Sequence, residues 1–518
     1  MPARRRFLPI AAVALAAVMA PAARGEVRPA GVFTDNMVLQ QELPIAVWGR
    51  ADPGEEVTVS LAGQSAGAKT GDDGRWRLSL PAMKADGRTH RLAIRGTNVV
   101  TLENVVVGEV WLCGGQSNMN RGVEIKDAHP GLRLFWIDFS TVPRREGFGA
   151  TAGWVEASPA GLAAAAPISE GRFKGKPRKQ FPEVGYVFGR RIHGELGVPV
   201  GLIKAAVGGS TVQSWTPRPD IGEAYPFGKA VEGSYLGHKE GLLYQSMIHG
   251  LVPLAMRGVL WYQGEDNGRD EQYHLHMKQW IESWRRLWNR PDMPVYFVQI
   301  APTTYAGGRM QFIWEAQSWV MHHVPHTAMA VSNDIYLHGR FPPEEVVGEE
   351  GTLHKKRSPS NPHPPNKHVV AERLAAIALV RTYGRPGRTL FGPMVASHTV
   401  DGRTVRIRFK YTGSGLVTRD GRPPTWFRVA AELPKDQRTA SDYHNWKRME
   451  FVPAEAEIVG NDTVLVHVPE RVKAPAYLGF AWHPIAVHNL MNKEGLPAVS
   501  FRLTLTDDAA CRLPESAQ

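Results

Sequence analysis

The stretch Val105-Val106-Val107-Gly108-Glu109-Val110-Trp111-Leu112-Cys113, continuing as Gly114-Gly115-Gln116-Ser117-Asn118-Met119, indicates how the middle of the chain folds. Its first part is almost entirely apolar, which is typical of a strand covered on both faces in a parallel sheet. Further apolar runs end in small or polar residues, at 198–207, 258–262, 295–300 and 328–331. Helical patterns lie between or after these runs, at 273–288, 312–322 and 367–383. The alternation predicts an α/β fold with helices on both faces of a parallel sheet.

The segments on either side of this region have a β pattern. Residues 45–48 and 57–61 before it, and 404–409 and 463–468 after it, are strand-like and separated by turn residues. We therefore predict a β-sandwich-like module at 26–104, a three-layer α/β domain at 105–386 and a second β module at 387–518.

The first 25 residues have the layout of a cleaved secretory signal. Arg4-Arg5-Arg6 precedes a short apolar core at 8–20, and small residues follow up to Gly25. This core is too short for a membrane span, and no later segment is apolar for long enough. We predict a secreted or periplasmic protein with no membrane span.

Composition excludes several other classes. The net charge is +11, but Lys and Arg are spread along the chain without a basic run interleaved with aromatics, so we predict no nucleic-acid partner. The two cysteines, Cys113 and Cys511, do not form a disulfide framework, and their pairing is left open. The histidines at 322, 323, 326, 338 and 354 show no repeated ligand spacing, so we predict no metal site.

Small and polar residues follow the first two predicted strands. Ser117 stands on a Gly-rich turn, where a nucleophile is exposed and its own N–H faces a substrate oxygen. Gly208 and Gly209 allow close backbone approach, and a free N–H there donates to an oxyanion. The alternative for both segments is an ordinary turn, since the Gly-x-Ser-x-Gly elbow is absent.

Two later segments complete the requirements for acyl transfer. The side-chain amide of Asn267 is a donor of the kind that a tetrahedral oxyanion needs, and nearby Glu265 is a candidate for holding loops together. Pro364 keeps His363 out of helical geometry, which presents its imidazole from a loop as a general base. A single histidine is more often structural, but all four segments fall on one rim of the predicted sheet.

These segments resemble the sialate O-acetylesterase family of SGNH hydrolases. The resemblance rests on four strings: Gly-Gln-Ser-Asn-Met ending at Met119, Gly-Gly-Ser ending at Ser210, Trp-Tyr-Gln-Gly-Glu-x-Asn ending at Asn267, and His-Pro-x-Asn-Lys ending at Lys367. It extends to 36–41 and 489–498, near the two ends of the mature chain.

The resemblance implies an SGNH-type domain and a role for each matching residue. Ser117 would be the nucleophile and His363 the base. The N–H of Ser117, an N–H of Gly208 or Gly209 and the Asn267 amide would form the oxyanion hole, with support from Gln116 and Glu265. The implied substrate is an acetylated sugar, above all an O-acetylated sialic acid, and no metal or organic cofactor is implied.

One position departs from the family pattern. Many bacterial relatives carry Asp shortly before this histidine, where this chain has Asn361. Three interpretations are open: a Ser–His dyad with a backbone carbonyl orienting His363, a charge supplied by another carboxylate such as Asp334, or a weak or inactive esterase. Two further functions compete with sialate deacetylation, namely a xylan or pectin acetylesterase and a glycan-binding protein with an impaired hydrolase site. For Trp215, Trp261 and Tyr262, sugar binding and packing are equally good explanations.

Overall fold

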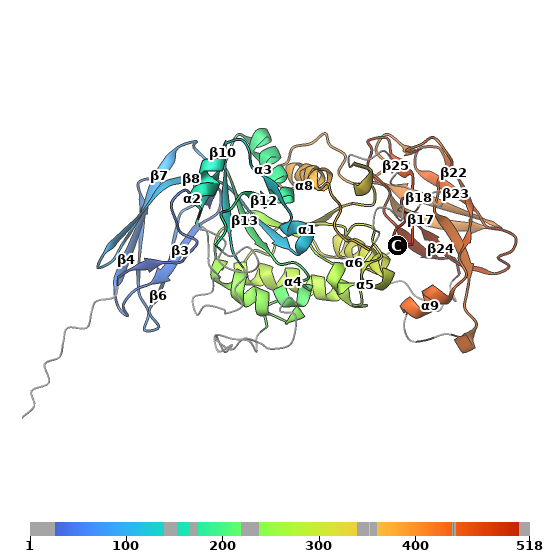
Figure 1. Cartoon of the computed structure of the whole chain (residues 1–518), viewed down its shortest axis with the longest axis horizontal. Coiled ribbons are helices and arrows are strands. Elements are labelled where there is room, and N and C mark those ends of the chain that lie inside the picture. Colours follow the sequence, from blue (N-terminus) through green and yellow to red (C-terminus); the bar gives the residue numbers. More distant parts are fainter. Residues whose placement is uncertain are drawn as a thin grey trace, which may run out of the picture.

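The structure, a computed structural model, describes residues 26–138, 153–165, 175–218, 238–338, 352, 360–437, 439 and 442–506. The predicted signal peptide, His354 and Cys511 lie outside the described residues. The chain forms three parts in a row, with the α/β domain between two β modules (Figure 1). Within the described residues no helix is long and apolar enough to cross a membrane.

All five predicted strands of the α/β domain are neighbours in one sheet. The sheet has the order β11-β10-β13-β8-β14-β15-β16. Its strands are β8 (Val99–Gly115), β10 (His129–Trp136), β11 (Val155–Ala157), β13 (Val200–Ala206), β14 (Gly258–Tyr262), β15 (Val295–Val298) and β16 (Thr327–Ala330). The α/β class is therefore confirmed.

The sheet is mixed, however, and two of its strands were not predicted. β10 pairs parallel with β13, but the edge strand β11 pairs antiparallel with β10. Arg133 interrupts the apolar run of β10, yet its side chain is buried and bonded to Glu156 and to the carbonyl of Pro130. The charge of Arg133 is therefore the reason why this buried strand was not predicted.

Helices cover both faces of this sheet. On one face α3 (Glu183–Leu196) and α8 (His368–Arg381) pack against each other, and on the other α4 (Tyr273–Trp288) packs against α6 (Met310–His323) (Figure 1). β8 is the first strand of the α/β domain's part of this sheet, and later strands lie on both sides of it. The carboxyl end of β8 is therefore the topological switch point, where open α/β sheets bind their ligands.

The N-terminal module consists of short strands that continue into β8. One sheet has the order β1-β3-β6, and β2, β4, β5 and β7 belong to the sheet of β8. The bounds are β1 (Arg28–Pro29), β2 (Val38–Gln40), β3 (Ile45–Arg50), β4 (Glu56–Leu61), β5 (Gln64–Lys69), β6 (Arg75–Leu80) and β7 (Thr89–Arg95). The predicted boundary at 104/105 falls inside β8, so one strand belongs to both units.

The C-terminal module has its own apolar core. Its sheets have the orders β17-β18-β23-β22, β19-β25 and β21-β20-β24-β26. The strands are β17 (Met394–Asp401), β18 (Thr404–Lys410), β19 (Leu416–Thr418), β20 (Phe427–Ala431), β21 (Val452–Pro453), β22 (Glu455–Val459), β23 (Thr463–His467), β24 (Pro475–Phe480), β25 (Leu490–Asn492) and β26 (Phe501–Thr504). The helix α9 (Asp442–Arg448) lies beside them (Figure 1).

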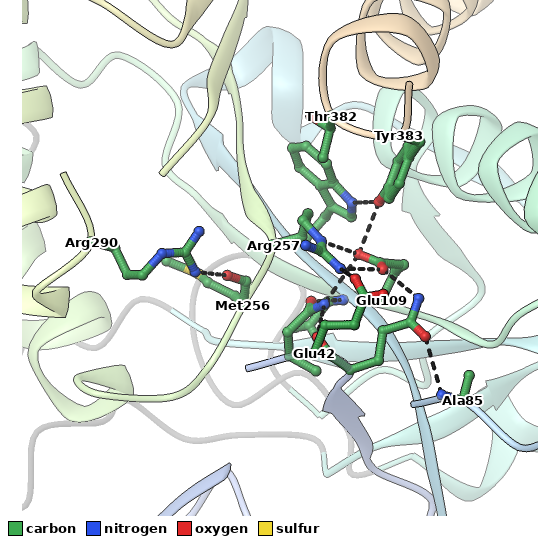
Figure 2. A network of polar contacts seen from close by, with 12 residues as sticks. Glu42, Ala85, Glu109, Met256, Arg257, Arg290, Thr382 and Tyr383 are labelled. Carbon is green, nitrogen blue, oxygen red and sulfur yellow. Dashed lines mark hydrogen bonds and ion pairs between the residues drawn. The ribbon is translucent and has the colours of Figure 1, made fainter. Parts of the chain in front are cut away.

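A buried carboxylate on β8 joins the N-terminal module to the α/β domain. The Glu109 side chain is fully buried and accepts hydrogen bonds from Gln40, Gln41, Arg257 and Tyr383. Arg257 contacts it through both Nε, at 2.7 Å, and Nη2, at 2.8 Å (Figure 2). Each lone pair has a partner, which is the condition under which a buried charge is tolerated.

We predict that Glu109→Ala lowers the Tm of the protein by at least about 5 °C, since it leaves the largely buried Arg257 with only the half-exposed carboxylate of Glu42, a change that costs about 3 kcal/mol. The matched control is Glu103→Ala on the same strand, whose ion pair with Arg91 is exposed and contributes less than about 1 kcal/mol. Thermal denaturation followed by circular dichroism checks both. Equal melting of the two variants would contradict the prediction.

Candidate active site

The turn after β8 exposes the Ser117 hydroxyl. Gly115 has φ +128°, and a Cβ there would lie 2.2 Å from the Tyr262 carbonyl oxygen, so only glycine fits. The N–H of Gln116 donates to that same carbonyl at 2.9 Å, which ties the turn to β14. Ser117 then begins the short helix α1 (Ser117–Asn120) and remains partly exposed. Its hydroxyl is therefore both fixed and accessible.

The structure brings His363 to Ser117 across 246 residues of chain. The Nε2 atom of His363 lies 2.7 Å from Ser117 Oγ. On the other side of the ring, Nδ1 lies 2.9 Å from the side-chain oxygen of Asn361. Because an amide oxygen can only accept, Nδ1 carries the proton, and Nε2 is left to accept the Ser117 hydroxyl.

The surroundings keep this imidazole neutral. Partial burial, together with the positive charges of Arg121 and Lys367, lowers the pKa of His363 to about 4. At neutral pH the ring is therefore a neutral imidazole whose Nε2 atom can accept a proton. The imidazolium that forms when it takes a proton has only the neutral Asn361 amide on its far side.

Neither of the first two interpretations of Asn361 describes the observed arrangement. Asp334 forms a buried two-point ion pair with Arg373, with both contacts at 2.7 Å, and a contact of 2.8 Å with His338. The Asp334 carboxylate is thus buried and paired with Arg373 and His338. It makes no hydrogen bond to His363 within the described residues. The group that orients His363 is the side-chain carbonyl of Asn361 rather than a backbone carbonyl.

A buried polar network holds the nucleophile turn against the histidine loop. The Asn118 amide nitrogen donates to Glu265 Oε1 at 2.5 Å and to the Pro362 carbonyl at 2.8 Å. Its amide oxygen accepts from Lys367 Nζ at 2.8 Å, and Lys367 also donates to the Pro364 carbonyl at 2.9 Å. The carbonyls on both sides of His363 are therefore anchored to the residue that follows Ser117.

Burial shifts both charged groups of this network toward neutrality. It raises the pKa of Glu265 to about 7, and it lowers the pKa of Lys367 to about 7. Both side chains are almost completely buried. Asn118 links the two groups by hydrogen bonds, whereas Glu265 Oε2 is buried without a hydrogen bond to any described residue.

The predicted residues Gln116, Gly208 and Gly209 lie on the Ser117 turn or on the turn packed against it. Gln116 accepts from the N–H of Gly264 at 3.3 Å and donates to Asp266 at 3.1 Å, so it joins the ends of β8 and β14. A Cβ on Gly208 would lie 3.4 Å from Ser117 Cβ, which places the turn after β13 directly against the nucleophile. Gly209 follows in the left-handed conformation, with φ +68°.

The predicted role of Asn267 as an oxyanion donor does not fit the structure. Its amide nitrogen already donates to Gln213 at 2.9 Å and to Asp270 at 3.0 Å. Its oxygen accepts from the N–H of Val212 at 3.0 Å and from Gln263 at 2.7 Å. Asn267 therefore fastens η1 (Val212–Trp215) to the loop after β14.

The remaining aromatic candidates are packed in the core. Trp215, Trp261 and Tyr262 are fully buried, and Trp261 stacks on Trp280 at 4.0 Å, so packing explains them. Among the described residues no group of three potential ligands could hold a metal ion. Cys113 is buried, has no disulfide partner among the residues that the structure describes, and packs against Gly185 of α3.

Sequence reasoning missed the roles of Asn118 and Lys367, although both stand in the quoted strings. Their one available signal was position, since Asn118 follows the nucleophile and Lys367 begins the helix after the histidine loop. A lysine next to an Asn-Pro-rich loop is normally solvated, and only the fold shows that this one is buried.

The chain is similar to several known carbohydrate esterases. Residues 107–340 match the family described as "Carbohydrate esterase, sialic acid-specific acetylesterase". The chain is 27% identical to the sialate O-acetylesterase of Homo sapiens over 410 residues, which covers 71% of this chain and 73% of the human protein. The Mus musculus protein of that name is 27% identical over 431 residues, covering 70% and 75%.

A solved structure extends the similarity to nearly the whole chain. A carbohydrate acetylesterase from Xanthomonas citri superimposes with a TM-score of 0.72 and 27% identity, covering 92% of this chain and 99% of that one. The resemblance to the sialate O-acetylesterase family is thus confirmed, and this chain is a carboxylic ester hydrolase.

Proposed function

We propose that this protein removes acetyl groups from sugar hydroxyls, with Ser117 as nucleophile and His363 as general base. The observation that carries the proposal is the 2.7 Å contact between Ser117 Oγ and His363 Nε2. Two residues that are 246 positions apart meet with the correct nitrogen facing the hydroxyl. This is the arrangement that serine acyl transfer requires.

The chemistry follows from that contact. Ser117 Oγ attacks the acetyl carbonyl while His363 Nε2 accepts the hydroxyl proton. The C–O bond to the sugar then breaks, and His363 returns the proton to the leaving sugar oxygen. A water molecule, deprotonated by His363, attacks the acetyl-serine, releasing acetate and restoring the Ser117 hydroxyl.

Backbone N–H groups would stabilise the oxyanion in both tetrahedral intermediates. Ser117 is the first residue of α1, where the N–H groups of a helical turn have no acceptor within the helix. The turn at Gly208 and Gly209 is the second source, because Gly208 packs directly against Ser117. Asn267 is left out of the hole, since its amide is bonded elsewhere.

The protein would work as a Ser–His dyad assisted by an amide. Asn361 fixes the ring and its tautomer, which is the positioning half of what a triad carboxylate does. It supplies little stabilisation of the imidazolium, so we expect lower turnover than a Ser–His–Asp centre on the same SGNH-type domain would give.

The proposed substrates are O-acetylated sialic acids, supported by the similarity to sialate O-acetylesterases. A second candidate is another acetylated glycan, such as xylan or pectin. The Xanthomonas citri carbohydrate acetylesterase favours it, because that similarity covers 92% of the chain. A purely glycan-binding protein is disfavoured, because the Ser–His contact is fully formed. The signal-like N-terminus supports secretion.

We expect Ser117→Ala to lower the hydrolysis of 4-nitrophenyl acetate by at least about 10³-fold, because the nucleophile is removed. The control is Ser65→Ala, an exposed serine in the N-terminal module, which should hydrolyse like wild type. Acetate release from acetylated sialic acids, xylan and pectin then ranks the substrates. Equal rates for Ser117→Ala and wild type would remove the catalytic assignment.

Restoring a carboxylate at position 361 tests the dyad. In the wild-type protein the acid limb of kcat/KM should lie near pH 4, where His363 becomes protonated and loses its basic form. In Asn361→Asp the negative charge favours the imidazolium, so the limb moves upward, and kcat at pH 8 rises by at least about tenfold.

Asn120→Asp is the control for that experiment, because it adds the same charge on the exposed end of α1 without touching His363. Its acid limb should remain near that of wild type. If Asn361→Asp changed neither the limb nor the turnover, the assigned role of Asn361 would be wrong.

A further inference from the structure

Arg121 carries an exposed positive charge one helical turn away from the nucleophile. Its N–H donates to the Ser117 carbonyl at 3.0 Å, and its own carbonyl accepts from the N–H of Glu183 at 3.0 Å, so its backbone is fixed on both sides. Residues four apart on such a turn have Cβ atoms about 5–6 Å from each other. The Arg121 side chain therefore begins beside Ser117, at the edge of the site.

The guanidinium of Arg121 forms no ion pair or hydrogen bond with any described residue. The nearby carboxylate of Glu183 accepts instead from the backbone N–H of Lys367, at 3.3 Å. Lys367, the second cation of the site, is buried and donates to Asn118. Glu183 and Glu265 are the carboxylates whose charges act on Lys367. Of these two cations, only Arg121 is placed to contact a substrate.

The positive charge around His363 is not balanced by a carboxylate. Arg121 and Lys367 both lower the pKa of His363, and no carboxylate among the described residues opposes them. On the far side of the ring stands the neutral amide of Asn361. The free enzyme therefore disfavours the imidazolium that must form during the reaction.

We propose that Arg121 selects acetylated sugars that carry a carboxylate, and that the bound carboxylate supplies the negative charge that Asn361 does not. The planar guanidinium holds both oxygens of a carboxylate at once. The bound carboxylate offsets the positive charge beside His363, so the imidazolium forms more readily in the enzyme–substrate complex than in the free enzyme. A neutral sugar provides neither effect.

Sialic acids and uronic acids share this chemistry. Each carries a carboxylate on its sugar ring, and such a group is ionised above about pH 4. The inference rests on the proposed function and narrows its substrates to acidic sugars, with sialic acids and the galacturonate of pectin as the two sources. Neutral acetylated xylose residues are disfavoured.

Binding can be tested without turnover, by calorimetric titration of full-length Ser117→Ala protein with N-acetylneuraminate, galacturonate and the methyl ester of each. We expect at least one acid to bind at least about tenfold more tightly than its methyl ester, and that acid identifies the source. Adding Arg121→Gln should abolish the difference, whereas adding Arg121→Lys should retain part of it. Adding Arg95→Gln, which removes an exposed arginine on β7, should retain all of it. Equal binding of acid and ester, or an unchanged difference with Arg121→Gln, overturns the proposal.

The pH dependence of turnover provides the second arm. In the wild type, the acid limb of kcat for the acetyl ester of the preferred acid should lie above the limb near pH 4 of kcat/KM for 4-nitrophenyl acetate, because the bound carboxylate favours the imidazolium. In Arg121→Gln the limb for 4-nitrophenyl acetate should move upward, since a positive charge is removed, while kcat/KM for the acidic ester falls at least about tenfold.

A merely structural role of Arg121 would lower both activities together and leave the acid limb in place, and that result overturns the proposal. Tighter binding of the acid without any esterase activity in the wild type overturns the proposed function alone.

Discussion

The side chain of Asn118 is the interaction on which the active-site geometry depends. One amide group bonds to Glu265 at the end of β14, to the Pro362 carbonyl and to Lys367 at the start of α8. Ser117 immediately precedes it and His363 immediately follows Pro362, so a single residue fixes the separation of nucleophile and base. Because the network is buried, an alternative arrangement would leave charged groups without partners, which is strongly unfavourable.

The neutral side chain of Asn361 affects both the pKa of His363 and the stability of the imidazolium that forms during the reaction. With no carboxylate behind the ring, the cationic neighbours and partial burial keep the pKa of His363 low, so the base form persists far into the acid range. The lack of a carboxylate behind the ring also leaves the imidazolium less stabilised in the transition state. The fold compensates by holding the histidine loop rigidly through three hydrogen bonds. The Asn361 side chain bonds to His363, the Tyr336 hydroxyl donates to the Asn361 carbonyl, and Lys367 donates to the Pro364 carbonyl.

Much of this could be predicted from the sequence, for physical reasons that also explain the failures. Fully apolar runs revealed the five parallel strands, and their shared carboxyl edge explains why Ser117, Gly208, Gln116 and Glu265 were correctly expected near one another. β10 was missed because Arg133 is buried in an ion pair with Glu156, which lies on another strand. Asn267 and Asp334 were assigned chemistry because their bonds to Gln213 and Arg373 are tertiary, and no local pattern encodes them.

The most direct test of the Asn118 constraint is the rate at which a fluorophosphonate labels Ser117, followed by peptide mass spectrometry. Wild type and Asn120→Ala, a neighbouring exposed position on the same turn, should label at Ser117 at equal rates. Asn118→Ala should label about 10²-fold more slowly, because a displacement of the pair by about 1 Å costs that much. Equal labelling of Asn118→Ala and wild type, or an adduct on a residue other than Ser117, would contradict the account.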